Sequence, residues 1–125
     1  MKVLVIGYGS AGKRHIQNIS DLHGFTITVC THRKIDNFLK KRKCIVIKNL
    51  DVCNSENFDF AIITNESNLH VKTALILARN KIPFILEKPL SHSINDVKKL
   101  ISLIKKNHLI TLMGCNLRFH PCIRK

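Results

Sequence analysis

Tryptophan is absent from this sequence, tyrosine occurs once, and the 125 residues contain only three prolines. Without aromatic side chains interspersed among the basic ones, the chain offers no stacking platform for nucleic-acid bases. The apolar run after Met1-Lys2 ends at Gly7, which is too early for a membrane span or the core of a secretory signal. We therefore expect a cytoplasmic protein without a membrane partner, and nucleic acid is the least favoured ligand.

The cysteines also lack a metal-binding pattern, because no C-x-x-C pair occurs and their number is odd. Several stand in or beside short apolar runs, where a thiol in a reducing compartment behaves as a small hydrophobic side chain. The sequence thus predicts no metal site, and buried, reduced cysteines. The set comprises Cys30, Cys44, Cys53, Cys115 and Cys122.

Acidic residues are scarce: 8 Asp and Glu stand against 21 Lys and Arg, which gives a formal net charge of +13. Such a charge favours anionic partners, including nucleic acid, a membrane surface or a phosphate-rich cofactor. The one dense cluster is Lys40-Lys41-Arg42-Lys43, and a solvated helix end explains it better than a nucleic-acid site does. The charge alone therefore does not identify the partner.

The stretch Gly7-Tyr8-Gly9-Ser10-Ala11-Gly12 is the most informative motif. It follows the apolar run Val3–Ile6, which is typical of a buried strand, and precedes apolar residues at helical spacing between Lys13 and Leu22. A strand, a G-x-G-x-x-G turn and a helix start are arranged for a pyrophosphate at the helix N-terminus. An ordinary turn is the alternative, but this context favours a dinucleotide site formed by residues 7–12.

The rest of the chain continues to alternate strands and helices. We therefore predict one α/β domain over residues 1–125, with a Rossmann-type doubly wound parallel sheet of about six strands. Further strands are expected at Phe25–Thr31, Cys44–Ile47, Phe58–Thr64, Pro83–Leu86 and Leu109–Met113. Helices are expected at Asp36–Arg42, capped by Asp36, at Leu69–Asn80 and at about Ile94–Asn107, which should bury Val97, Leu100, Ile101 and Ile104. Residues 48–58 are expected to form a loop or a broken helix.

The end of the second predicted strand bears on cofactor choice. A free ribose 2′-hydroxyl is usually bound by an acid about twenty residues after the glycine turn, but this chain has Thr31, His32 and Arg33 there. A guanidinium can bind a 2′-phosphate through two hydrogen bonds. The residues favour NADP(H) over NAD(H), with Arg33 as the residue that binds the phosphate. The alternative is that Arg33 and Lys34 are only solvated charges of a loop.

Four segments at the carboxyl ends of the predicted strands carry a family resemblance. They read I-G-Y-G-S-A-G-K-R-H, T-N-E-S-N-L-H, L-E-K-P-L and G-C-N-L-R-F-H-P, in that order. With them, essentially the whole chain resembles the N-terminal half of the glucose-fructose oxidoreductase / inositol dehydrogenase / rhizopine-catabolism (Gfo/Idh/MocA) family. The sequence departs modestly from the family pattern at two positions. Asn65 stands where a proline is common, and Cys115 stands where a tyrosine is common.

The resemblance implies hydride transfer between nicotinamide and a hydroxyl or carbonyl carbon, usually of a sugar or cyclitol. It implies that Lys88 is the catalytic lysine, and an ammonium there would stabilise alkoxide character on the substrate. An exposed strand-end lysine is the alternative for Lys88, and the Lys88-Pro89 bond is expected to be cis. Further cofactor-binding positions implied by the resemblance are Thr64, Asn65, His70, Glu87, Asn116 and Arg118, although a lone histidine such as His70 is more often a packing residue.

Family enzymes continue into an α+β domain that supplies the substrate pocket and much of the oligomer interface. This sequence ends at Lys125, and residues 114–125 match the start of the passage to that domain. We therefore expect a chain that binds a dinucleotide but turns over no substrate alone, with a polyol or sugar reached only through the missing domain. A stand-alone, non-catalytic dinucleotide-binding module is the second possibility, and a nucleic-acid-binding protein the third.

Overall fold

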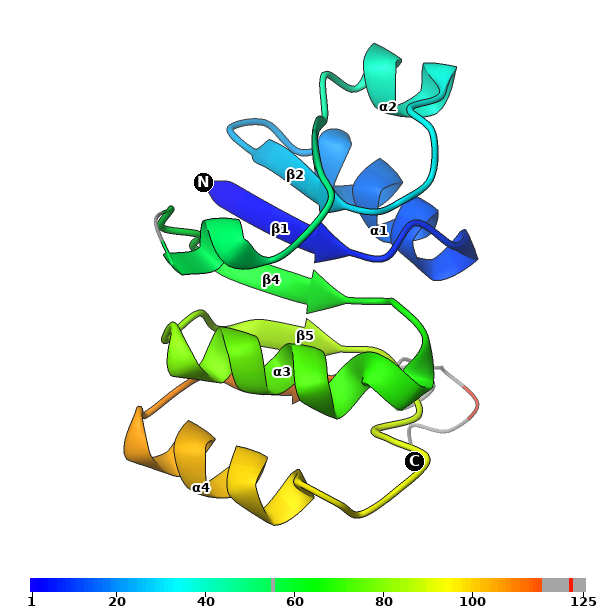
Figure 1. Ribbon diagram of the computed structural model, residues 1–125. Coiled ribbons are helices and arrows are strands. Elements are labelled where there is room, and N and C mark those ends of the chain that lie inside the picture. Colours follow the sequence, from blue (N-terminus) through cyan, green and yellow to red (C-terminus); the bar gives the residue numbers. More distant parts are fainter. Residues whose placement is uncertain (55, 116–121, 123–125) are drawn as a thin grey trace.

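The computed structural model of the protein describes residues 1–54, 56–115 and 122. Its six strands form one parallel sheet in the order β3-β2-β1-β4-β5-β6 (Figure 1). This arrangement confirms the predicted doubly wound sheet, since the chain starts in the middle and proceeds first to one edge and then to the other. The strands are β1 (Lys2–Ile6), β2 (Thr26–Cys30), β3 (Ile45–Ile47), β4 (Phe60–Ile63), β5 (Phe84–Leu86) and β6 (Thr111–Met113).

The helices form layers on the two faces of the sheet. Figure 1 shows α3 and α4 in front of the sheet and α1 behind it, with α2 at the top of the view, above β2. The order of strands reverses between β1 and β4, which leaves a crevice at their carboxyl ends. The helices are α1 (Ser10–Ser20), α2 (Asn37–Lys41), α3 (His70–Arg79) and α4 (Val97–Lys106), and two short 3₁₀ turns are η1 (Asp51–Asn54) and η2 (Ser67–Leu69).

The core lies on both sides of the central strand. Val3, Leu4 and Val5 of β1 are fully buried, as expected for a parallel strand covered on both faces. Leu4 packs into the cluster beneath α3 and α4, whereas Val3 and Val5 pack into the cluster beneath α1. The apolar run of β1 therefore packs against both helix layers, and it ends directly before the glycine turn.

Two helices differ from their predicted limits. Helix α1 begins at Ser10 rather than Lys13, because Gly9 already serves as its N-cap, and it ends at Ser20, which leaves Leu22 exposed. Helix α4 begins at Val97, after Asp96 in a left-handed conformation, so Ile94 is exposed. Ile101 was expected in the core but is 46% exposed, because α4 packs mainly through Leu100 and the partly buried Val97 and Ile104.

Three helices end in the same way. Lys43, Lys81 and His108 follow α2, α3 and α4 with φ angles of 52°, 55° and 51°. In each case the next residue donates its backbone N–H five residues back, as Ile82 does to the Leu77 carbonyl at 3.0 Å. This is the Schellman arrangement, in which glycine usually occupies the left-handed position.

The edge strand β6 is only partly covered. Ile110 and Leu112 are 75% and 61% exposed, and Leu112 pairs with Ile85, which packs on the α1 side of the sheet. Predicted cysteine burial holds for Cys53, whereas Cys30, Cys44 and Cys115 are half-buried and Cys122 is exposed. In residues 1–54, 56–115 and 122, no helix is long and apolar enough to cross a membrane.

Candidate functional site

The turn between β1 and α1 is shaped by its glycines. Gly7 has a φ of +103°, and an added Cβ would lie 2.6 Å from the Asn65 backbone nitrogen. A Cβ on Gly12 would lie only 2.3 Å from the Gly7 carbonyl oxygen, so this glycine allows the helix to pack against the turn. A Cβ on Gly9 would meet no atom of residues 1–54, 56–115 or 122 within 4 Å. Gly9 therefore borders open space that a ligand can approach.

Helix α1 directs its N-terminus toward this open space. Within the described part of the chain no side chain caps the N-terminus of this helix, and its first backbone hydrogen bond runs from the Lys13 nitrogen to the Gly9 carbonyl at 3.0 Å. Ser10 and Ala11 belong to the first turn, where free N–H groups and the helix dipole favour an anion. The turn thus has the geometry of a phosphate-binding helix start.

A cavity of about 720 Å³ opens at this edge of the sheet. It lies over the carboxyl ends of β1, β2, β3 and β4, where the reversal of strand order predicts a ligand site. Its walls include eight residues that the sequence predicted for the cofactor. These eight are Gly7, Tyr8, Gly9, Thr31, His32, Arg33, Thr64 and Asn65.

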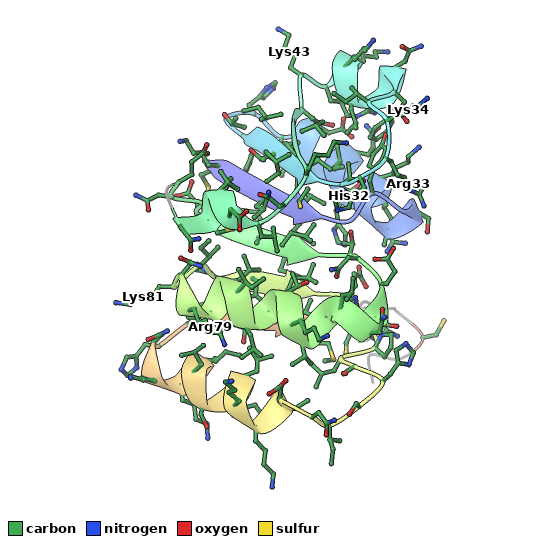
Figure 2. The ribbon with its side chains drawn as sticks, viewed as in Figure 1. His32, Arg33, Lys34, Lys43, Arg79 and Lys81 are labelled. Atoms are coloured by element: carbon green, nitrogen blue, oxygen red, sulfur yellow. The ribbon has the colours of Figure 1, made fainter. Side chains whose placement is uncertain are left out.

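The β2 side of the cavity is basic. Thr31 is buried and its hydroxyl accepts a hydrogen bond from the Arg33 backbone nitrogen at 3.2 Å, whereas the side chains of His32 and Arg33 are exposed. Figure 2 shows His32, Arg33 and Lys34 toward the edge to which the strands point. Lys48, which follows β3, also lines the cavity, and its ammonium donates to the Arg33 carbonyl oxygen at 3.3 Å.

A carboxylate near this wall is held by other groups. The Tyr8 hydroxyl donates to Asp36, and Lys13 lies 3.3 Å from the same carboxylate and 4.7 Å from the Tyr8 ring centroid. Asp36 also caps α2 by accepting from the Leu39 nitrogen, as predicted. The hydrogen bond from Tyr8 is the main cause that lowers the pKa of Asp36, while burial and Asp36 raise the pKa of Tyr8.

The β4 side of the cavity is formed by Thr64 and Asn65. The Thr64 hydroxyl donates to the carbonyl oxygens of Ile6 and Gly7 at 3.0 and 3.2 Å, which ties β4 to the glycine turn. The Asn65 amide nitrogen donates to Thr73, but its side-chain oxygen is buried without a hydrogen-bond partner among the described residues. A buried acceptor in a cavity wall is a place where a ligand can donate a hydrogen bond.

His70 lies outside the cavity wall. Its side chain is buried, with ring nitrogens 2.7 Å from the Pro89 carbonyl oxygen and 3.0 Å from the Asn65 carbonyl oxygen. These contacts are typical of a packing residue, the role that sequence reasoning favoured, and a cofactor-binding role of His70 stays a prediction. Through these two contacts it connects the segment after β4, where Asn65 lines the cavity, to the segment after β5.

Glu87 and Lys88 lie further along the same sheet edge, after β5, and neither lines the cavity. Glu87 is held from α1, since His15 Nε2 lies 2.7 Å and the Arg14 guanidinium 3.7 Å from its Oε1 atom. The Lys88-Pro89 bond is cis, as expected. The Lys88 side chain is exposed. Asn116 and Arg118 lie outside the described residues.

Sequence reasoning missed three of these relationships. Arg14 and His15 directly follow the glycine turn in the sequence, yet both contact Glu87, which follows β5. The link between Tyr8 and Asp36 joins residues 28 positions apart and left no local pattern. The place of Lys48 at the site could have been predicted from the sequence. It directly follows the third predicted strand, and the carboxyl ends of parallel strands share one edge.

Among the described residues, no group of three or more His, Cys, Asp or Glu side chains could hold a metal ion. The fold, the glycine turn and the cavity define a dinucleotide-binding Rossmann domain. Residues 1–115 match the Gfo/Idh/MocA family, described as an oxidoreductase family with an NAD-binding Rossmann fold. The chain belongs to this family.

Similar proteins are considerably longer than this chain. A myo-inositol 2-dehydrogenase of Thermotoga maritima is 24% identical over 130 residues, which cover 100% of this chain and 39% of that protein. The structure of a probable dehydrogenase from T. maritima is 25% identical with a TM-score of 0.86, and the match covers 97% of this chain and 38% of that chain. An Agrobacterium radiobacter oxidoreductase was crystallised with NAD⁺, L-tartaric acid and magnesium. Its structure has a TM-score of 0.82 at 20% identity, and the match covers 94% of this chain and 36% of that chain.

Proposed function

We propose that this chain is the cofactor-binding part of an oxidoreductase that transfers hydride between NADP(H) and a sugar or cyclitol hydroxyl or carbonyl carbon. Family membership supports the general activity, and the name of the inositol dehydrogenase relative supports the substrate class. The chain spans 39% of that relative, so the remaining part of the enzyme would supply the substrate pocket.

The residues at the cavity fit a dinucleotide. Open space at Gly9 suits the close approach of a pyrophosphate, and the N-terminus of α1 supplies the positive end of a helix dipole. The unpartnered side-chain oxygen of Asn65 offers an acceptor to a hydroxyl or amide group of the cofactor. These three features lie in one cavity, as binding of one extended ligand requires.

The balance of charge on the β2 side carries the preference for NADP(H). Among the described residues that line the cavity, Glu66 is the one acid, and it follows β4 rather than β2. Asp36 follows β2, but its carboxylate is held by Tyr8, Lys13 and the Leu39 nitrogen. A ribose 2′-hydroxyl would thus lack its usual acidic acceptor, whereas a 2′-phosphate would find Arg33.

Lys88 and Glu87 would serve the nicotinamide end of the site. The bound nicotinamide would accept or donate the hydride. The exposed ammonium of Lys88 can approach the reacting oxygen of a substrate, stabilise its negative charge and relay its proton. Glu87 is fixed by His15 at 2.7 Å, so the segment that carries Lys88 is held against α1.

This proposal is tested by titrating the purified chain with NADPH and with NADH and measuring binding by calorimetry. We expect NADPH to bind more tightly, and Arg33→Ala to remove most of the difference with little effect on NADH. Equal binding of both cofactors would contradict the preference, and no binding of either would contradict the dinucleotide site. We also expect negligible substrate-dependent reduction of NADP⁺ by the isolated chain, and robust turnover would show that no further domain is needed.

A further inference from the structure

A lysine directly after the strand that neighbours β2 has no assigned role. Lys48 directly follows β3, which is the outermost strand next to β2. The Thr31 nitrogen donates to the Ile47 carbonyl oxygen at 3.0 Å, and this bond sets the ends of β2 and β3 side by side. Lys48 and Arg33 therefore enter the same cavity from adjacent strands.

The position of the Lys48 ammonium is defined by one contact. Its Nζ atom donates to the Arg33 carbonyl oxygen at 3.3 Å. An ammonium has three N–H donors, so this bond leaves two for a ligand. Among the described residues, Lys48 forms no ion pair with a carboxylate. Its charge is thus available beside Arg33.

The surroundings favour an anion at this place. The cavity wall near Arg33 and Lys48 continues with the neutral side chains of Asn49 and Leu50. Asp36 is engaged by Tyr8 and Lys13, and Glu66 belongs to the segment after β4, with β1 and β2 between that strand and β3. Among the described residues that line the cavity after β2 and β3, a phosphate dianion would meet two cations, Arg33 and Lys48, and no acid.

We infer that Lys48 is a second specificity-determining residue of the cofactor site, which binds the 2′-phosphate of NADP(H) together with Arg33. This inference rests on the proposed function. A guanidinium fixes the orientation of the phosphate through paired hydrogen bonds, whereas an ammonium acts as a point charge that can follow its oxygens. The two residues thus have complementary roles on one phosphate.

The test separates the 2′-phosphate from the rest of the cofactor. Adenosine 2′,5′-bisphosphate and 5′-AMP serve as probes beside NADPH and NADH, with calorimetry on the wild type, Lys48→Ala and Lys48→Gln. We expect both variants to bind NADPH and the bisphosphate about five- to tenfold more weakly, as for loss of one exposed charge-assisted contact, with NADH and 5′-AMP unchanged. Lys48→Arg should retain most of the NADPH affinity.

The matched control is Lys34→Ala, which removes an exposed lysine from the loop that carries Arg33 but outside the cavity wall. It should leave the binding of all four probes unchanged, and thermal melting should show that every variant is folded. If Lys48→Ala weakens all probes equally or none of them, the inference about Lys48 is wrong while a wild-type preference for NADPH still supports the proposed function. If the wild type binds no dinucleotide, both proposals fail.

Discussion

The hydroxyl of Tyr8 donates to both carboxylate oxygens of Asp36, at 2.7 and 2.9 Å, and so joins the glycine turn to the N-terminus of α2. Tyr8 is 4% exposed, and its ring also packs beside Phe38. The cavity wall and the segment after β2 are thus held together by one side chain. We therefore expect changes at this pair to affect the stability of the fold and its dependence on pH.

Tyr8→Phe removes the hydroxyl and keeps the ring. We expect the melting temperature to fall by a few degrees, because the Asp36 carboxylate loses its main hydrogen-bond donor while the ring still fills its place. Calorimetric or fluorescence-monitored melting measures the change. Phe38→Leu is the control, since it changes the neighbouring ring and leaves the hydroxyl bond in place. A melting temperature of Tyr8→Phe equal to that of the wild type would contradict this role.

The same pair predicts a pH dependence of stability. The pKa of Asp36 is lowered in the folded state, so its contribution is present above the unfolded value of about 3.9 and is lost as the pH falls through the folded pKa. The pKa of Tyr8 is raised, so its contribution is present below about pH 10 and is lost as the pH rises further. Denaturant unfolding at several pH values should show both losses in the wild type and weaker ones in Tyr8→Phe.

Gly9 and Gly12 are expected to respond differently to the same added methyl group. Gly12→Ala would force a Cβ against the Gly7 carbonyl and should destabilise the fold by about 2 kcal/mol or more. Gly9→Ala meets no protein atom and should leave stability within about 0.5 kcal/mol of the wild type. It should nevertheless weaken dinucleotide binding about tenfold, because the methyl group occupies the approach to the pyrophosphate.

Unfolding curves and NADPH titrations of both variants check this contrast. Gly24→Ala is a useful reference, because Gly24 also has open space around its Cβ position but lies far from the cavity and has a φ of +85°. This variant should be less stable because of backbone strain. Its folded molecules should bind NADPH as tightly as the wild type does. Normal NADPH binding by Gly9→Ala would mean that no ligand approaches the turn at this point.

The left-handed residue after α3 offers a stabilising change. Lys81→Gly should raise the free energy of unfolding by about 1 kcal/mol, because glycine adopts this φ without the strain of a Cβ atom. Lys81→Ala separates this effect from the loss of charge and should give no gain. Lys43→Gly and His108→Gly act at the ends of other helices, so the three gains should add. Chemical denaturation measures each of them.

The exposed side chains of β6 predict self-association of the isolated chain. Leu112 of the edge strand β6 and Ile110, directly before it, are exposed, and apolar residues at a sheet edge favour pairing with another molecule. Sedimentation velocity should show an average mass that rises with concentration, and Ile110→Lys with Leu112→Lys should reduce this rise without lowering the melting temperature. Lys99→Glu on the exposed side of α4 is the control. A wild-type chain that stays monomeric at high concentration would contradict the prediction.

Much of the fold follows from short-range patterns. The β-branched run of β1, the glycines after it and the alternation of strands with helices were enough to predict six parallel strands and their common carboxyl edge. Asp36 was recognised as a cap because the signal is local, within three residues. The helix limits were less accurate where a pattern of apolar residues continued past the end of the helix, as at Leu22 and Ile94.

The parts that sequence reasoning missed depend on contacts between distant residues. His15 meets Glu87 across 72 positions, and nothing near either residue indicates the other. The exposure of Ile101 depends on how α4 is rotated against α3, which helical spacing alone leaves open. Lys48 and Arg33 come together only through the register of β2 and β3. The motifs located the site, but tertiary packing determines which side chains stand in it.

The end of helix α3 places positive charge away from the cavity. Helix α3 runs opposite to the strands, so Arg79 in its last turn and Lys81 after it lie toward the edge from which the strands start (Figure 2). The cavity at the other edge is lined by His32, Arg33 and Lys48, so the molecule is basic at both ends of its strands. A negatively charged support should therefore hold the molecule in more than one orientation.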